Sequence, residues 1–327
     1  MNPATEYPLI GIVGPTGSGK SALAACLARR LGGEIVNCDA MQVYRGLDVG
    51  TAKVSPEIRA EIPHHLLDVV EVSQRFSAGQ FQDLARQALE GIRARRNWPI
   101  LAGGTGFYLR TVLYGIFEAP GRDEALRDRL NRIRERRGPE VLHRILGRRD
   151  PEAARRIAPR DFQRICRALE VAHATGRPFT EHFGTSERPL TGFMPRMYCL
   201  NVPRPELHDR IARRVADMLA GGLVDEVRGL LARGVAPDAK GLEAIGYRQV
   251  MEHLAGRLTW LEMARRIEVD TRRYAKRQMT WFRKERGLVA VAGTGDDPAV
   301  QARVFEDIAA AFGAHPLWET VRARMNQ

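Results

Sequence analysis

The fold is decided by the segment Pro8-Leu-Ile-Gly-Ile-Val-Gly14-Pro-Thr-Gly-Ser-Gly-Lys20-Ser21-Ala-Leu-Ala-Ala-Cys-Leu-Ala-Arg-Arg-Leu31. It predicts a strand, a phosphate-binding loop with the pattern Gly14-x4-Gly19-Lys20-Ser21, and a helix with leucines at helical spacing. Glycines let backbone N–H groups converge on phosphate oxygens, and the lysine and the helix N-terminus add positive potential. We therefore expect a di- or triphosphate here, either from a nucleotide such as ATP or from another molecule. The expected phosphate ligands are Gly14, Pro15, Thr16, Gly17, Ser18, Gly19, Lys20 and Ser21, and the Ser21 hydroxyl is the expected Mg²⁺ ligand.

Length and composition are those of a soluble cytoplasmic protein. The 327 residues contain no apolar run long enough for a membrane span, and residues 1–6 do not resemble a signal peptide. The four cysteines lie far apart without metal-ligand spacing, so we expect reduced thiols and no zinc site.

The net charge of +12 predicts an anionic partner larger than one diphosphate. The excess lies in two segments. Residues 122–188 contain seventeen arginines against eleven acidic residues, and residues 265–286 contain nine basic residues against three acidic ones. Either segment alone could form a solvated helix face. Both together, beside a phosphate loop, favour a nucleic-acid surface.

Buried strands are predicted at residues 34–38, 66–70, 99–102 and 197–202. Asp39 follows the first of them, and the glycine-rich stretch containing Thr105 follows the third. The carboxyl ends of parallel strands meet at one edge of a sheet, so we expect Asp39 and Thr105 to face the phosphate loop. The alternatives are a helix N-cap for Asp39 and a simple turn around Thr105.

The predicted fold class is α/β, a P-loop NTPase-like core with a mostly parallel sheet and a helical insertion domain. Residues 116–195 read as short, arginine-rich helices, so residues 1–115 and 196–327 form the core and its C-terminal helices. In the insertion, Gln163, Arg164 and Arg167 lie near one another on a helix whose apolar positions, such as Ile165, pack inward. Two further helices are predicted, one over residues 207–219 and a long basic one over residues 261–284.

Four stretches together resemble the tRNA dimethylallyltransferases, also called tRNA isopentenyltransferases. They are the phosphate loop, Asp39-Ala-Met-Gln-Val-Tyr-Arg45 with Gly50-Thr-Ala-Lys53, Gly103-Gly-Thr-Gly-Phe-Tyr108, and Gly246-Tyr-Arg-Gln249 with Ala275-Lys-Arg-Gln278. The resemblance implies transfer of a dimethylallyl group from its diphosphate to N6 of the adenosine immediately 3′ of the anticodon. Ala40 stands where this family usually has serine, which removes one hydroxyl; we expect activity to persist.

The resemblance also implies roles for individual residues. Asp39 would be the general base, Thr105 would bind the oxygen that links the allyl carbon to the diphosphate, and Lys20 with Arg214 and Arg210 would bind diphosphate oxygens. The implied tRNA contacts are Asp39, Ala40, Met41, Gln42, Thr105, Arg127, Gln163, Arg164, Ile165, Cys166, Arg167, Arg248, Lys276 and Arg277. The helical insertion would hold the anticodon stem-loop. Mg²⁺ is the implied cofactor, tRNA and dimethylallyl diphosphate are the implied partners, and we expect a monomer.

Three alternatives stay open at this point. A small-molecule or nucleoside kinase would use the same loop for ATP but leaves the two basic segments unexplained. An isopentenyltransferase acting on free adenine nucleotide would share the chemistry but needs no arginine-rich insertion. A nucleotide-switched RNA-binding protein would require a guanine-reading motif, which this sequence lacks.

Overall fold

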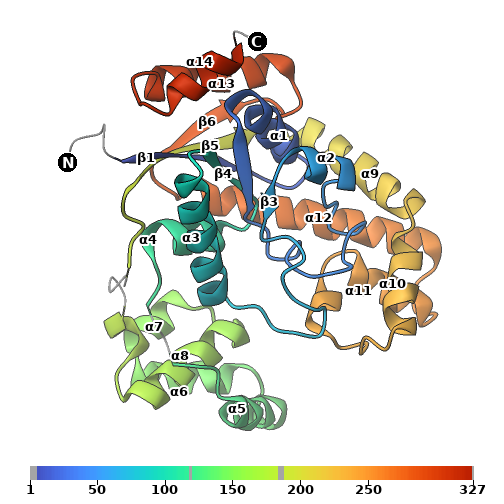
Figure 1. Ribbon diagram of the computed structural model, residues 1–327. Coiled ribbons are helices and arrows are strands. Elements are labelled where there is room, and N and C mark those ends of the chain that lie inside the picture. The colour runs from blue at the N-terminus through green and yellow to red at the C-terminus, as the bar shows by residue number, and fades with distance from the viewer. Residues whose placement is uncertain (1–5, 118–119, 183–187, 326–327) are drawn as a thin grey trace. The chain divides into compact units, whose positions relative to one another are not determined.

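The computed structural model describes residues 6–117, 120–182 and 188–325, and the chain forms two compact units (Figure 1). Unit 1 comprises residues 1–113 and 190–327, and unit 2 comprises residues 114–189. The observed division lies two to six residues before the predicted boundaries at 116 and 196. The reason is that the Leu190 N–H donates to the Leu113 carbonyl at 2.9 Å, which joins the two halves of unit 1 beside the insertion.

Unit 1 contains a six-stranded sheet, in which every observed pairing is parallel. The strands are β1 (Tyr7–Val13), β2 (Gly33–Asn37), β3 (His64–His65), β4 (Trp98–Gly103), β5 (Phe193–Asn201) and β6 (Leu288–Ala292), in the order β3-β2-β4-β1-β5-β6. β1 lies between β4 and β5, so the phosphate loop that follows it leaves the middle of the sheet. The predicted α/β class is confirmed.

Helices cover both faces of this sheet. The helices of unit 1 are α1 (Lys20–Leu31), α2 (Pro56–Glu61), α3 (Ala78–Ala94), α4 (Gly106–Tyr114), α9 (Arg204–Ala220), α10 (Leu223–Ala232), η2 (Lys240–Glu243), α11 (Tyr247–Leu254), α12 (Trp260–Phe282), α13 (Pro298–Phe312) and α14 (Trp318–Met325). Ile10 and Ile12 pack with α1, α13 and α14, whereas Leu9 and Val13 pack with α3 and α4. Side chains alternate along a strand, so β1 is apolar on both faces, as expected for a buried parallel strand.

A third apolar cluster joins the segment after β2 to α9, α10, α11 and α12. Val43, Leu47, Ile211, Tyr247 and Ile267 are among its buried members. This cluster holds α9 and α12 beside the end of the sheet where the phosphate loop lies.

The predicted strand at residues 66–70 is wrong. Strand β3 covers only His64–His65, and Leu66 and Asp68 have φ values of 62° and 56°. The ammonium of Lys53, whose side chain is fully buried, pairs with Asp68 at 2.5 Å and with Asp48 at 2.7 Å. The chain therefore turns around a buried cation, although its apolar composition is that of a strand.

An ion-pair network lies at the opposite end of the sheet from the phosphate loop. Glu34, at the start of β2, accepts hydrogen bonds from Arg95 and Asn97 and pairs with His65. Burial alone would raise the pKa of Glu34, but the hydrogen bonds from these three neighbours outweigh it and lower the pKa to about 2.

Unit 2 is helical in the residues that the structure describes. It contains α5 (Glu124–Arg137), α6 (Glu140–Arg149), α7 (Pro151–Arg156), α8 (Phe162–Thr175) and η1 (Phe179–His182). Leu130, Leu142, Leu146, Ile165 and Cys166 form its own apolar core. Across the described parts of both units, no helix combines the length and the apolar character needed to cross a bilayer.

Candidate active site

The phosphate loop joins β1 to α1. Gly19 caps α1 with a φ of 84° and without a side-chain hydrogen bond, so the first N–H groups of the helix are available to an anion. Lys20 folds back over the loop and donates from Nζ to the Pro15 carbonyl at 2.7 Å. Burial, together with the charge of Arg214, lowers the pKa of Lys20 to about 8. An anionic ligand beside this ammonium would raise its pKa again.

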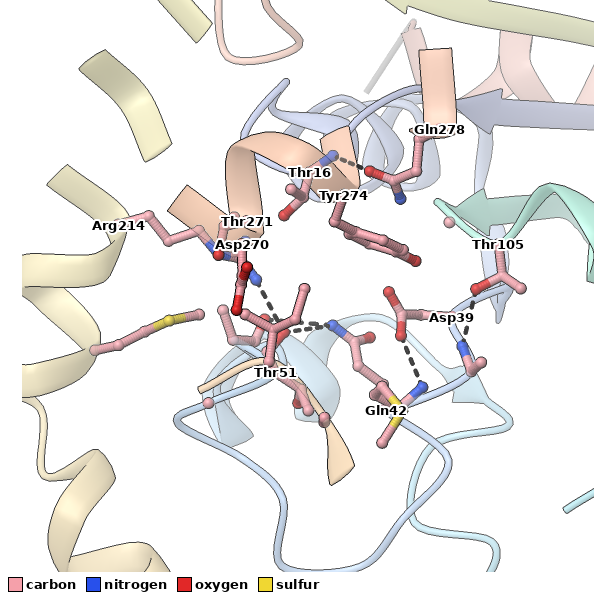
Figure 2. Close-up of a pocket in the computed structure, with 18 of the residues that line it drawn as sticks. Thr16, Asp39, Gln42, Thr51, Thr105, Arg214, Asp270, Thr271, Tyr274 and Gln278 are labelled. Carbon is pink, nitrogen blue, oxygen red and sulfur yellow. Dashed lines mark hydrogen bonds between the residues drawn. The ribbon is translucent and has the colours of Figure 1, made fainter. Parts of the chain in front are cut away.

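A cavity of about 700 Å³ opens beside the loop, and all of its lining residues belong to unit 1. The lining includes these residues predicted for the site: Thr16, Lys20, Ser21, Asp39, Ala40, Met41, Gln42, Thr105, Arg214, Arg248 and Arg277. Residues from the ends of β2 and β4 thus meet the phosphate loop, as the parallel-strand argument predicted. Helices α9 and α12 supply the other walls (Figure 2).

Asp39 and Thr105 are held by the backbone around them. The Oδ1 atom of Asp39 accepts the Met41 N–H at 2.8 Å, and the other oxygen of this carboxylate faces the cavity (Figure 2). The Thr105 hydroxyl accepts the Ala40 N–H at 3.0 Å. Since Ala40 uses its backbone for this bond, the missing serine hydroxyl leaves the contact intact.

Arg214 reaches the cavity from α9. Its Nη2 donates to the Thr51 carbonyl at 3.1 Å, and Gln42 Nε2 donates to the same carbonyl at 3.1 Å. Burial lowers the pKa of Arg214, and the nearby Asp39 carboxylate opposes that shift. The residue predicted to bind diphosphate and a residue predicted to bind tRNA therefore share one acceptor.

Arg210 lies outside this cavity. It lines a second cavity of about 450 Å³, which shares Lys20, Ser21, Ala52 and Arg214 with the first. Its guanidinium donates to the Gly17 carbonyl at 2.7 Å and forms two hydrogen bonds with Asp296. In this arrangement all three guanidinium nitrogens of Arg210 bond to the loop and to Asp296. The diphosphate contact predicted for Arg210 stays a prediction.

Two residues of α12 were not assigned a role from the sequence. Gln278 accepts the Thr16 N–H at 2.8 Å and donates to the Gly104 carbonyl at 2.8 Å, so one buried amide joins the phosphate loop to the segment that carries Thr105. Tyr274 points into the cavity beside Asp39 and Thr105 (Figure 2). Burial raises the pKa of Tyr274, and the charge of Asp39 adds to this effect.

A sequence signal for Gln278 existed. It occupies the same buried stripe of α12 as Ile267, Ala275 and Phe282. A glutamine at such a position requires hydrogen-bond partners inside the protein. Lys276 and Arg277, which lie between Ala275 and Gln278 in the sequence, are exposed; Arg277 lines the cavity and Lys276 does not.

The residues of unit 2 that were predicted to contact tRNA differ in their exposure to solvent. Gln163 and Arg164 are exposed on α8. Ile165 and Cys166 are buried in the core of the unit, with 1% and 0% exposure, as the helical periodicity indicated for Ile165. The tRNA contact that the resemblance implies at these two positions stays a prediction.

Arg127 is also largely enclosed within unit 2, since its side chain is 14% exposed and pairs with the buried Glu170. Arg167 donates to the Pro120 carbonyl at 3.0 Å and also pairs with Glu170. These contacts give both arginines a structural role in unit 2.

Comparison with known proteins identifies relatives along the whole chain. The model of the family described as IPP transferase matches residues 42–285. A protein of Solibacter usitatus named tRNA dimethylallyltransferase is 45% identical over 94% of this chain and 99% of its own length. A protein of Anaeromyxobacter sp. (strain K) with the same name is 49% identical over 91% of this chain and 97% of its own.

Solved structures agree with these sequence matches. The tRNA isopentenylpyrophosphate transferase of Bacillus halodurans superposes with a TM-score of 0.69 at 36% identity, covering 98% of this chain and all of its own. A eukaryotic dimethylallyltransferase described as acting on tRNA gives a TM-score of 0.77 at 29% identity, over 95% of this chain and 80% of its own.

Proposed function

This chain belongs to the IPP transferase family, and we propose that it transfers the dimethylallyl group of dimethylallyl diphosphate to N6 of the adenosine that follows the anticodon in tRNA. One observation carries the proposal. A single cavity brings the phosphate loop together with a carboxylate, Asp39, and a hydroxyl, Thr105. These are the groups needed to hold a diphosphate, to accept a proton and to assist departure of the leaving group.

The diphosphate binds at the phosphate loop in this proposal. Lys20, the N–H groups at the start of α1 and Arg214 surround the boundary between the two cavities. Negative charge on the diphosphate grows as its bond to the allyl carbon breaks, so preorganised donors stabilise the transition state more than the bound substrate. The larger cavity then receives the dimethylallyl group and the acceptor base.

Asp39 serves as the general base. The N6 lone pair of adenine is delocalised into the ring, so loss of a proton as the new N–C bond forms makes the amine a better nucleophile. The N–C bond forms, the C–O bond breaks with its electron pair leaving on the diphosphate, and the N6 proton passes to Asp39. Met41 holds one carboxylate oxygen, which leaves the other directed at the acceptor.

Thr105 donates its hydroxyl proton to the bridging oxygen of the donor substrate. The Ala40 N–H fixes the oxygen of this hydroxyl, and the Tyr274 hydroxyl lies within hydrogen-bond reach of it, so the donor substrate would replace Tyr274 as the acceptor of the Thr105 proton. A donor at that position lowers the charge on the oxygen from which the allyl carbon departs.

Mg²⁺ fits the residues present at the site. The described residues contain no cluster of three histidine, cysteine or acidic side chains that could enclose a metal. Mg²⁺ commonly binds through few protein ligands together with water and substrate phosphate oxygens. Ser21, which lines both cavities, would be its protein ligand. When bound, Mg²⁺ neutralises part of the charge on the diphosphate.

The acceptor adenosine must leave the base stack to enter the cavity. Gln42, Met41, Arg248 and Arg277 line the side of the cavity that the base would use. Unit 2 would bind the anticodon stem through exposed side chains such as Arg164, with salt-sensitive affinity.

The test is incubation of the purified protein and Mg²⁺ with radiolabelled dimethylallyl diphosphate, with unmodified tRNA and AMP offered in parallel. Label in tRNA alone supports the proposal. Label in AMP would identify a nucleotide-acting enzyme, and ATP hydrolysis without label transfer would identify a kinase. Asp39→Asn should retain diphosphate binding and reduce transfer by about 10² or more. Unchanged turnover in this variant would remove Asp39 from the role of base.

A further inference from the structure

The segment after β6 packs against the phosphate loop. The Gly295 N–H donates to the Ser18 carbonyl at 2.9 Å, and Gln301 Nε2 holds the Gly295 carbonyl at 2.9 Å. A Cβ atom placed on Gly19 would lie 2.7 Å from a carboxylate oxygen of Asp296. The segment therefore contacts the side of the loop that faces away from the larger cavity.

Arg210 completes this contact from α9. Its Nε donates to the Gly17 carbonyl at 2.7 Å, while Nη1 and Nη2 donate to the two Asp296 oxygens at 3.0 and 2.7 Å. The planar guanidinium thus fixes a loop carbonyl with one edge and a carboxylate with the other. Its side chain is only 21% exposed.

These bonds determine which way the peptide groups of the loop face. A peptide unit is planar, so a carbonyl held on one side turns the N–H of the next residue toward the other side. Arg210 holds the Gly17 carbonyl, and the Gly295 N–H holds the Ser18 carbonyl. The Ser18 N–H donates to the Pro15 carbonyl at 3.3 Å, so the Gly19 N–H is the next one along the loop that these contacts direct toward an anion. The glycine-rich surroundings of these carbonyls, with φ values of 82° at Gly17 and 84° at Gly19, allow many conformations when no partner restricts them.

We propose that Arg210 and Asp296 form a brace, a pair of positioning residues that holds the N–H groups of the phosphate loop toward the diphosphate. Arg210 is then a support for the loop and not a ligand of the diphosphate. This inference rests on the proposed function, in which that anion belongs to the prenyl donor. Asp296 lies beyond residues 42–285, the part of the chain that the family model matches.

The opposite arrangement makes the opposite prediction. If Arg210 left Asp296 to bind diphosphate directly, Asp296 would compete with the ligand, and Asp296→Asn would tighten binding. For a brace, Asp296→Asn weakens binding, because the neutral amide no longer holds the guanidinium against Gly17. The sign of one measurement separates the two.

The experiment is calorimetric titration of the full chain with inorganic diphosphate in the presence of Mg²⁺. We expect Asp296→Asn and Arg210→Ala each to raise the dissociation constant about tenfold, and the double variant to match Arg210→Ala within about twofold, since both act through one contact. The dissociation constant of Arg210→Lys should be raised as much as that of Arg210→Ala, because an ammonium cannot bond to Gly17 and to both Asp296 oxygens in one plane.

Asp307→Asn is the matched control. Asp307 forms a similar two-bond pair with Arg196 in unit 1, at 2.9 and 2.8 Å, away from the loop. It should change the melting temperature without changing diphosphate affinity. Equal or tighter binding by Asp296→Asn, or a double variant whose defects multiply, would overturn the brace. The proposed function and the brace can fail separately. If the unmodified chain does not modify tRNA, but Asp296→Asn still weakens its binding of diphosphate, the proposed function is refuted and the brace is retained.

Discussion

The amide of Gln278 offers a quantitative test of how the two halves of the site are aligned. Replacing it with methionine keeps the length of the side chain but removes both hydrogen bonds, to Thr16 and to Gly104. An unsatisfied buried backbone group costs about 1–3 kcal/mol. The Gly104 carbonyl would lose its donor in a buried site, whereas the half-buried Thr16 N–H can recover a bond to water. We therefore expect Gln278→Met to lower the free energy of unfolding by about 1–3 kcal/mol.

The effect on catalysis should exceed the effect on stability. Gln278 sets the position of Thr105 relative to the phosphate loop, and a misplacement of about 1 Å can cost roughly 10² in rate. Single-turnover transfer at saturating substrates measures this directly, at a temperature where urea titration shows the variant to be folded. Gln82→Met is the matched control, since Gln82 on α3 is also 6% exposed but lies away from the cavity.

A transfer rate equal to that of the unmodified chain in Gln278→Met would refute the alignment argument, whatever the loss of stability. Gln278→Glu gives a second check. A carboxylate still accepts the Thr16 N–H, but it repels the Gly104 carbonyl and places negative charge beside the diphosphate. This variant should therefore bind diphosphate more weakly than Gln278→Met.

Four further predictions concern charge. Burial and a neighbouring guanidinium lower the pKa of Lys20 to about 8, so above that pH diphosphate binding should take up a proton and weaken, which calorimetry in buffers of different ionisation enthalpy would reveal. Arg127→Ala should destabilise unit 2 by about 3 kcal/mol by leaving Glu170 buried without its main partner, seen as a lower unfolding midpoint. Arg164→Ala should leave that midpoint unchanged, weaken tRNA binding and reduce the salt dependence by about one charge. The pKa of Glu34 is about 2 in the folded protein and about 4.3 in the unfolded chain, so the stability it contributes is complete above pH 4.3 and is lost as the pH falls toward 2. In urea titrations, Glu34→Gln should reduce the fall in unfolding free energy over this pH range.

Local signals in the sequence were sufficient for the core of the fold. The phosphate loop has its glycines, lysine and flanking elements within one short stretch, and apolar runs marked β2, β4 and β5. Knowledge that parallel strands end at one edge then brought Asp39 and Thr105 together, and both line the cavity. The strand predicted at residues 66–70 was wrong. These residues have the apolar pattern of a strand, but the chain there turns around the buried ammonium of Lys53.

Contacts between distant residues left no such pattern. Gln278 meets Thr16 across 262 positions of the chain, and Arg210 meets Asp296 across 86. Neither pair follows from periodicity or turn chemistry. The diphosphate contact predicted for Arg210 came from resemblance and stays a prediction. Its bonds to Gly17 and Asp296 could not be foreseen from the sequence. For Ile165, helical spacing indicated burial, and the predicted tRNA contact disagreed with it.

The phosphate loop is synthesised well before the residues that support it. Residues 14–21 precede Arg210, Gln278 and Gly295, which supply those supports. Pairing over such sequence separations is slow, because the intervening chain must be ordered before the contact forms. A nascent or truncated chain that ends before α9 would carry the complete loop sequence without the groups that shape it. The presence of the motif in a fragment is therefore a poor guide to whether that fragment binds phosphate.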